Sequence, residues 1–243
     1  AAINMFVPVP ISAMVVPIAV AIVVLQVWGS YHLIVKIFKW LTLSLFAYVI
    51  AAFLAKPDWF AVAKATFVPQ ITFSSEYITT IVAILGTTIS PYLFFWEASE
   101  EVEEEKEEGR NSIASRRGAT DGEIKKEKID TVIGMLFCNI VFYFVIVSAG
   151  ATLHVTGQTD IQSATDAAQA LRPLAGNFAT VLFGIGLIGA GLLAIPVLTG
   201  SAAYAVAETF NWPSGLDEKP RHAKKFYGVI AASTLVGVAI DFA

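Results

Sequence analysis

The sequence predicts an all-α membrane protein, a polytopic bundle of membrane-spanning helices. Of its 243 residues, 56% are hydrophobic and 15% are charged, whereas soluble domains have about 45–50% apolar and about 25% charged residues. The apolar residues also fall into uncharged runs of the length that a spanning helix needs, roughly 20 residues. This composition excludes a disordered chain, a disulfide-stapled scaffold and an ordinary soluble enzyme domain.

The first three expected spans have few or no charges. Residues 11–28 form the first, and Pro17 allows it to bend. Residues 33–55 form the second, with two lysines near its first end, where long side chains can reach the interface. Residues 77–96 form the third, which Pro91 interrupts.

The remaining spans complete what we expect to be one transmembrane domain, residues 1–243. The fourth span, 131–153, carries no charge. The uncharged run 173–207 would measure roughly 50 Å as a helix, too long for one straight crossing, so we place the fifth span at 177–207. Residues 226–243 begin a sixth, which we expect to be truncated.

Basic residues orient these spans. Thirteen of the 16 Lys and Arg lie in the segments 29–40, 97–130 and 208–225, which alternating spans place on one side of the membrane. Short cytoplasmic loops collect such residues. We therefore expect a multi-pass protein of the cell membrane, in contact with the lipid bilayer, whose charged loop 97–130 is cytoplasmic.

The loop 97–130 also dominates the acidic charge, because residues 100–108 hold seven of the 20 Asp and Glu. Without them the chain would be slightly basic, so the net charge of −4 indicates no nucleic-acid partner. Acidic residues followed by basic ones allow local pairing in a solvated loop. The functional alternative is a cytoplasmic mouth that attracts cations.

Enzyme and cofactor motifs are absent from the sequence, so we expect neither an enzyme nor a resident cofactor. Cys138 is the only cysteine, and neither HExxH nor GxSxG occurs. A GxGxxG pattern at 184–189 lies inside a span, where small residues favour close helix packing over nucleotide binding. Pro196 marks a second, less specific helix break.

The most informative segment is 86–92, Gly-Thr-Thr-Ile-Ser-Pro-Tyr, in the middle of the third span. Pro91 removes a backbone donor there, and unpaired carbonyls are tolerated at such depth only where protein, water or an ion meets them. Secondary transporters build ion sites at broken helices of this kind. The alternative is a proline kink whose carbonyls are satisfied by Thr and Ser hydroxyls.

Several segments in order resemble the NRAMP family of divalent metal transporters. Residues 84–92 resemble its sixth transmembrane helix, whose usual motif is Gly-Ala-Thr-Val-Met-Pro-His. Residues 57–69 resemble the external loop before that helix, and 166–191 the entry into its eighth helix. The resemblance implies a LeuT-like inverted-repeat fold, of which this chain covers about helix three or four to helix nine.

The resemblance also implies functional residues. The family's carbonyl ligand aligns with Thr87, and its metal-binding Met aligns with Ser90, a hard oxygen ligand in place of a soft thioether. Its two histidines align with Tyr92 and Glu97, which would line the ion path together with Asn139. The family's Asp-Pro-Gly-Asn motif in the first helix has no counterpart in this sequence.

These observations predict secondary transport of a divalent cation, with Thr87 and Ser90 as metal ligands and Pro91 holding the helix open. Mn²⁺ and Fe²⁺ are the usual ions of the family, and the Ser90 oxygen also suits Mg²⁺. Proton coupling and uniport both stay open. The alternatives are a transporter of an amino acid or other organic substrate, and a non-transporting membrane partner that binds another protein through its acidic loop.

Overall fold

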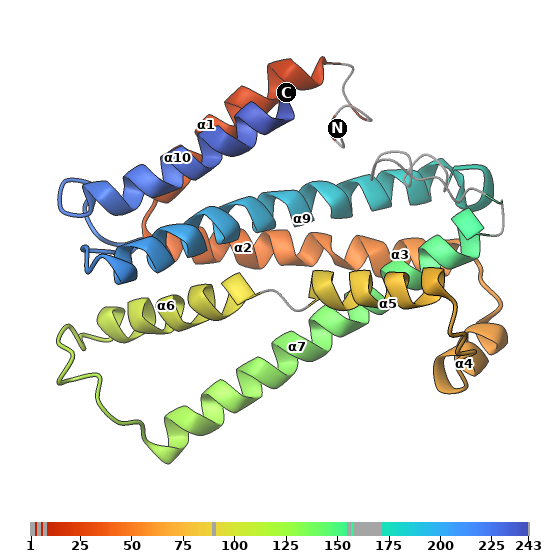
Figure 1. Ribbon diagram of the computed structural model, residues 1–243, viewed down its shortest axis with the longest axis horizontal. Coiled ribbons are helices and arrows are strands. Elements are labelled where there is room, and N and C mark those ends of the chain that lie inside the picture. Colours follow the sequence, from red (N-terminus) through yellow and green to blue (C-terminus); the bar gives the residue numbers. More distant parts are fainter. Residues whose placement is uncertain are drawn as a thin grey trace.

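Figure 1 shows the computed structural model of the chain, which describes residues 9–88, 91–154 and 172–242 with the single residues 3, 6 and 157. The longer elements of these ranges are all helical, which confirms the predicted all-α class. The helices are α1 (Ile11–Trp28), α2 (Tyr31–Ser44), α3 (Phe46–Leu54), α4 (Trp59–Phe67), α5 (Ser75–Thr88), α6 (Pro91–Glu107), α7 (Asp121–Ala149), the π-helical turn η2 (Gly150–His154), α9 (Arg172–Thr209) and α10 (Lys224–Asp241).

Three helical segments in the described ranges are long and apolar enough to cross a membrane. They are Tyr31–Leu54, which joins α2 to α3, Asp121–Thr152 and Thr180–Thr209. Two shorter apolar helices, Ser12–Trp28 and Ser75–Gly86, accompany them. The chain is therefore an integral membrane helix bundle.

Helix α9 lies at the centre of the bundle and packs against α10, α3, α6, α2 and α1 (Figure 1). Small residues let its neighbours touch its backbone. A Cβ atom on Gly186 would come within 2.9 Å of the Tyr48 ring, and one on Gly200 would collide with the Trp96 ring. Gly186 belongs to the GxGxxG pattern, so close packing of that pattern is confirmed.

A buried polar contact joins α1 to α9. The Gln26 side chain is 1% exposed, and its Nε2 donates to the Pro196 carbonyl at 3.0 Å. The Thr199 hydroxyl donates to Gln26 Oε1 at 3.1 Å. Because α9 continues through Pro196 from Arg172 to Thr209, the break expected there is absent, and Thr199 bonds the Ile195 carbonyl at 3.0 Å within the helix.

Three connections, which belong to the segments that hold most of the basic residues, lie at one end of the bundle. Figure 1 shows the α1–α2, α6–α7 and α9–α10 connections together at that end, with α4 at the opposite end. His32 Nδ1 lies 3.5 Å from Glu107 Oε2, which places the start of α2 beside the end of α6. This arrangement is the one that alternating spans require.

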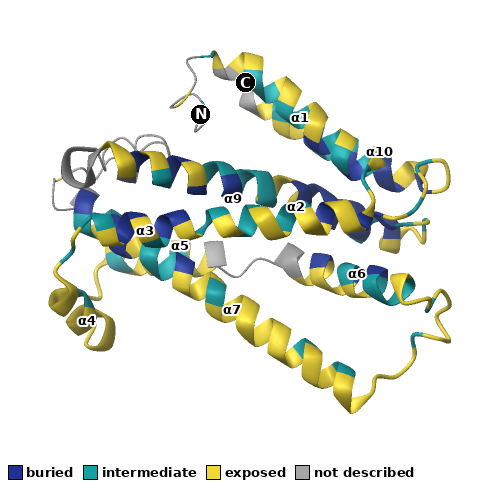
Figure 2. Cartoon of the chain, turned by 180° about the vertical axis from the view of Figure 1, so that it is seen from behind, coloured by how far each residue is buried: buried dark blue, intermediate teal, exposed yellow. Residues whose placement is uncertain are grey.

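Large apolar residues are exposed on the outer helices α4, α5 and α7, and Figure 2 shows that most of α4 and α7 is exposed. Four large apolar residues of α5 are exposed: Ile78, Ile81, Val82 and Leu85. In the described part of the chain α5 makes no substantial packing contact with another helix. Such a surface suits lipid or further protein chain.

We predict that Gly200→Ala lowers the thermal stability of the protein, because the new methyl group collides with the Trp96 ring. Overpacking of this kind costs about 1–3 kcal/mol. The measurement is the midpoint of thermal unfolding in detergent. Gly191→Ala is the control on the same helix, since nothing lies within 4 Å of its Cβ position. Equal midpoints for the two variants would contradict the close approach of Trp96.

Candidate functional site

The third predicted span is described as two helices, and residues 89 and 90 between them lie outside the described residues. Helix α5 ends at Thr88 and α6 begins at Pro91. Proline suits the first position of a helix, where its missing N–H would have no partner. Thr87 lies in the last turn of α5 and Tyr92 in the first turn of α6, whereas Ser90 falls outside the described residues.

The two other residues proposed for the ion path are described in full. Glu97 is exposed on α6, one and a half turns after Pro91. Asn139 is exposed on α7, and its Nδ2 donates to the Met135 carbonyl at 2.7 Å. The Asn139 amide therefore turns back onto its own helix in this structure.

Conventional metal ligands do not gather in the described residues, which contain no group of three or more His, Cys, Asp or Glu that could hold a metal ion. Helix α5 carries one acidic residue, Glu76, in its first turn. The side of the break that α5 forms therefore offers neutral oxygens, from hydroxyl groups and backbone carbonyls.

The carboxylates of α6 are not all solvated, contrary to the expectation for the loop 97–130. Trp96, Ser99 and Glu103 are buried, with exposed fractions of 6%, 5% and 2%. Glu100 Oε1 is buried and has no hydrogen-bond partner among the described residues. Burial raises the pKa of Glu100 to about 7, and the charge of Glu97 adds to the shift. Two carboxylate groups of α6, those of Glu100 and Glu103, are thus shielded from water.

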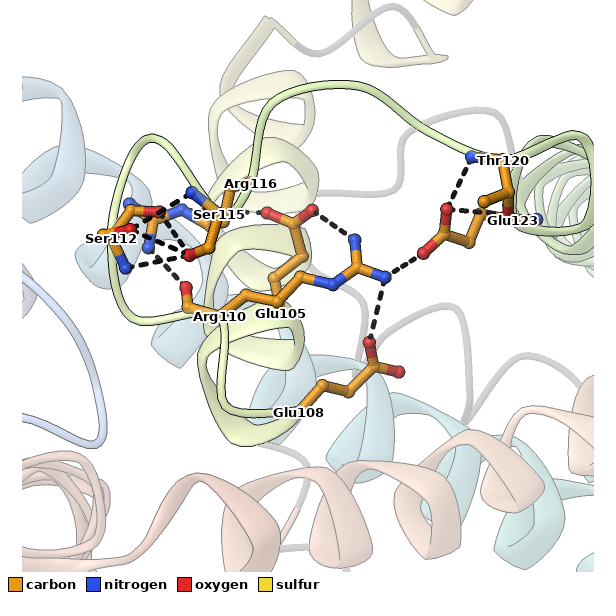
Figure 3. Close-up of polar contacts among 8 residues, drawn as sticks. All are labelled: Glu105, Glu108, Arg110, Ser112, Ser115, Arg116, Thr120 and Glu123. Atoms are coloured by element: carbon orange, nitrogen blue, oxygen red, sulfur yellow. Dashed lines mark hydrogen bonds and ion pairs between the residues drawn. The ribbon is translucent and has the colours of Figure 1, made fainter.

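Ion pairs connect the end of α6 to the start of α7, as Figure 3 shows. The Arg110 guanidinium pairs with Glu123 and lies 3.4 Å from Glu105 Oε1. Lys126 Nζ lies 2.7 Å from Glu104 Oε1. The local pairing of acidic with basic residues predicted for this loop is confirmed.

Helix α7 begins at a capping box. The Thr120 hydroxyl accepts the Glu123 N–H at 3.3 Å, and Glu123 Oε2 accepts the Thr120 N–H at 2.6 Å. These hydrogen bonds and Arg110 hold the pKa of Glu123 down at about 2. The carboxylate therefore stays charged where it caps the helix.

Comparison of the sequence with known families decides which family this helical chain belongs to. The family model described as natural resistance-associated macrophage protein-like matches residues 1–243. The chain belongs to the NRAMP family.

Curated relatives of this NRAMP chain carry the name divalent metal cation transporter MntH. The protein from Caldanaerobacter subterraneus subsp. tengcongensis is 27% identical over 221 residues, which cover 91% of this chain and 49% of the relative. The protein from Pectobacterium carotovorum subsp. carotovorum is 30% identical over 60% of this chain and 32% of the relative. The chain spans about half the length, or less, of the curated relatives that it matches.

Two buried polar side chains in this NRAMP chain were missed by reasoning from the sequence. The burial of Gln26 could have been predicted from the sequence, since a polar side chain inside a predicted span is costly to place in lipid and usually pairs with another polar group. The burial of Glu103 could not, because it stands among six other carboxylates whose pattern indicates a solvated helix end. Its burial depends on Tyr204 and Gly215, more than 100 residues further along the chain.

We predict that Thr120→Ala frays the first turn of α7, because it removes the hydroxyl that accepts the Glu123 N–H. Loss of such a cap costs on the order of 1 kcal/mol, which corresponds to roughly fivefold faster amide exchange in that turn. The measurement is hydrogen–deuterium exchange of residues 121–125. Exposed Lys125→Ala serves as the control. Unchanged exchange in Thr120→Ala would contradict the capping role.

Acid should loosen the same turn. The pKa of Glu123 is lowered from 4.5 to about 2, so its contribution to stability is complete above 4.5 and is lost as the pH falls toward 2. We expect exchange of residues 121–125, corrected for the intrinsic effect of pH, to rise over this interval. Glu123→Gln should not show that rise, and a rise of equal size in Glu123→Gln would assign the effect to another group.

Proposed function

We propose that this chain forms part of a secondary transporter of divalent metal cations in the cell membrane. The observation that carries the proposal is the match of residues 1–243 to the NRAMP family, and the Ser-Pro sequence between α5 and α6 supports it. The names of the curated relatives support the same cargo. The cation is the substrate of the protein, and we propose neither a resident cofactor nor an enzymatic reaction.

The proposed ion ligands lie at the break. Thr87 would offer its backbone carbonyl, and Ser90 its hydroxyl or carbonyl. Pro91 would keep the helix open, because it supplies no N–H to pair a carbonyl of the preceding turn. Hydroxyl and carbonyl oxygens are hard ligands that suit Mg²⁺ and Mn²⁺, whereas thioether ligands favour softer transition metals. The oxygen at Ser90 therefore favours a harder ion than the Met of the usual family motif.

The proposed path leads from the break along α6 toward the loop 97–130. Tyr92 and Glu97 lie one after the other on that half-helix, and Asn139 would approach the path from α7. Thirteen of the 16 basic residues lie in segments on the side of this loop. The positive-inside rule therefore supports a cytoplasmic position for the loop 97–130.

We predict that Ser90→Met shifts the selectivity of the full-length parent protein from Mg²⁺ toward Mn²⁺. A thioether binds a transition metal better than a hard ion, so the ratio of Mn²⁺ to Mg²⁺ uptake should rise, by about tenfold for 1.4 kcal/mol of differential binding. The measurement is uptake of each ion into proteoliposomes. Ser90→Ala, which removes the proposed hydroxyl ligand, should reduce uptake of both ions.

Thr80→Ala is the matched control for these variants. Thr80 lies on α5 two turns before the break, is exposed, and donates to the Glu76 carbonyl at 2.9 Å. We expect its uptake and selectivity to equal those of the unmodified protein. An unchanged Mn²⁺ to Mg²⁺ ratio in Ser90→Met would remove Ser90 from the ion site, and the absence of any divalent uptake by the parent protein would refute the transport function.

A further inference from the structure

Helix α6 is held against α9 by a stripe of buried residues that follows the break. Trp96, Ser99 and Glu103 are spaced three and four residues apart, so they lie on one face of the helix. Trp96 contacts α9 where Gly200 leaves room for its ring. Glu103 lies two turns further along, beside the residues 210–223 that connect α9 to α10, which we call the 210–223 segment.

The Glu103 carboxylate is almost fully enclosed, with 2% of the residue exposed. Its Oε1 lies 3.4 Å from the Tyr204 hydroxyl on α9 and 3.4 Å from Lys106 Nζ on its own helix. A Cβ atom on Gly215 would come within 2.6 Å of the same oxygen. Gly215 also has a φ of 151°, a region in which residues with side chains are strained. Both properties favour glycine at this contact.

The Tyr204 hydroxyl links Glu103 to the backbone of the 210–223 segment. It accepts the Leu216 N–H at 3.2 Å while it donates to Glu103. Leu216 itself is 2% exposed. A backbone amide, a phenol and a carboxylate thus form one buried chain of hydrogen bonds between the segment and α6.

Tyr227 holds the same segment from α10. Its hydroxyl lies 3.1 Å from the Gly215 carbonyl, 3.2 Å from the Leu216 carbonyl and 2.8 Å from the Glu218 carbonyl. The segment is therefore bonded to α9 through Tyr204 and to α10 through Tyr227. Glu103 is the side chain by which α6 joins this network.

We propose that Glu103 is a positioning residue for ion transport: by docking on Tyr204 and Gly215 it fixes the half-helix α6, and with it the helix break at Pro91. This inference rests on the proposed function, because the break is the proposed ion site. Trp96 and Glu103 hold α6 at two points on one face, so a shift of either moves the start of the helix. Loss of the Glu103 contact should therefore alter the geometry of the ligands at the break.

The docking has a defined response to pH. Burial raises the pKa of Glu103, and the charge of Asp217 adds to the shift while Lys106 opposes it. A raised pKa in the docked state means that docking favours the neutral carboxyl group, so docking is strongest at low pH and weakens as the pH rises through that pKa. The pocket beside Glu103 is also lined by titratable groups of α6 and of the 210–223 segment: Lys106, Glu107, Asp217, Glu218, Lys219 and His222. Glu100, Tyr204, Tyr227 and Tyr31 are the other titratable groups nearby.

Hydrogen–deuterium exchange of residues 214–218 in the purified full-length protein tests the docking without any transport measurement. Glu103→Ala should accelerate exchange there by about tenfold, which corresponds to about 1.4 kcal/mol and lies in the range for one hydrogen bond. Tyr204→Phe, which removes only a hydroxyl, should act in the same direction. Glu103→Gln keeps the acceptor oxygen and should stay protected at low and high pH, whereas the unmodified protein loses protection as the pH rises.

Glu108→Gln is the matched control, since Glu108 is exposed and has no contact with the segment in the described structure. Exchange in Glu103→Ala equal to that control would overturn the docking. A pH response in Glu103→Gln as large as that of the unmodified protein would assign the response to Glu100 or Asp217 and overturn the role of Glu103.

Uptake of Mn²⁺ and Mg²⁺ tests the positioning role. Glu103→Ala should raise the apparent KM by about tenfold, as misplaced ligands lose roughly 1.4 kcal/mol of binding, and Glu103→Gln should restore it. A normal KM with accelerated exchange would show that docking does not position the ion site, and so would overturn the inference while transport stands. Absence of uptake by the unmodified protein would instead refute the proposed function. The exchange measurement would then still test whether Glu103 docks α6 on the 210–223 segment.

Discussion

Close approach to the backbone of α9 is the constraint on which the rest of the bundle depends. Lipid is as apolar as a leucine side chain, so helices in a membrane associate through packing and hydrogen bonds, and small residues permit that packing. Gly186 receives the Tyr48 ring of α3, and Gly200 receives the Trp96 ring of α6. Helices α3 and α6 are therefore placed by α9, even though α9 contributes none of the proposed ligands.

The two halves of the broken span are held very differently. Helix α6 docks on α9 through Trp96 and Glu103, whereas α5 has no substantial packing partner in the described part of the chain. Because the exposed face of α5 is apolar, lipid or further protein must cover it in a membrane. The chain spans about half the length of its relatives, and on the proposed function the remaining half supplies that cover beside the ion site.

The fold class could be predicted because it depends on local sequence, whereas the helix break at Pro91 stays a prediction, since residues 89 and 90 lie outside the described residues. Apolar length predicts spans, and Pro91 favours the first position of a new helix. The burial of Glu103 and the continuity of α9 through Pro196 could not be predicted in this way. Each depends on contacts distant in sequence, with Gly215 in the first case and Gln26 in the second. The ligand role of Ser90 rests on the family resemblance, since that residue falls outside the described residues.

The distribution of charge separates ion binding from helix positioning. Neutral oxygens surround the break on α5, while carboxylates begin six residues into α6 and reach the enclosed site of Glu103. Hydroxyl and carbonyl oxygens alone compensate poorly for the water that Mg²⁺ gives up, so on the proposed function a further carboxylate has to approach the break from outside α5 and α6. A half-helix fixed at its distant end by a buried carboxylate keeps its first turn in place for such a partner. Since that carboxylate docks best when neutral, the proposed docking links proton concentration to ion affinity through the position of α6.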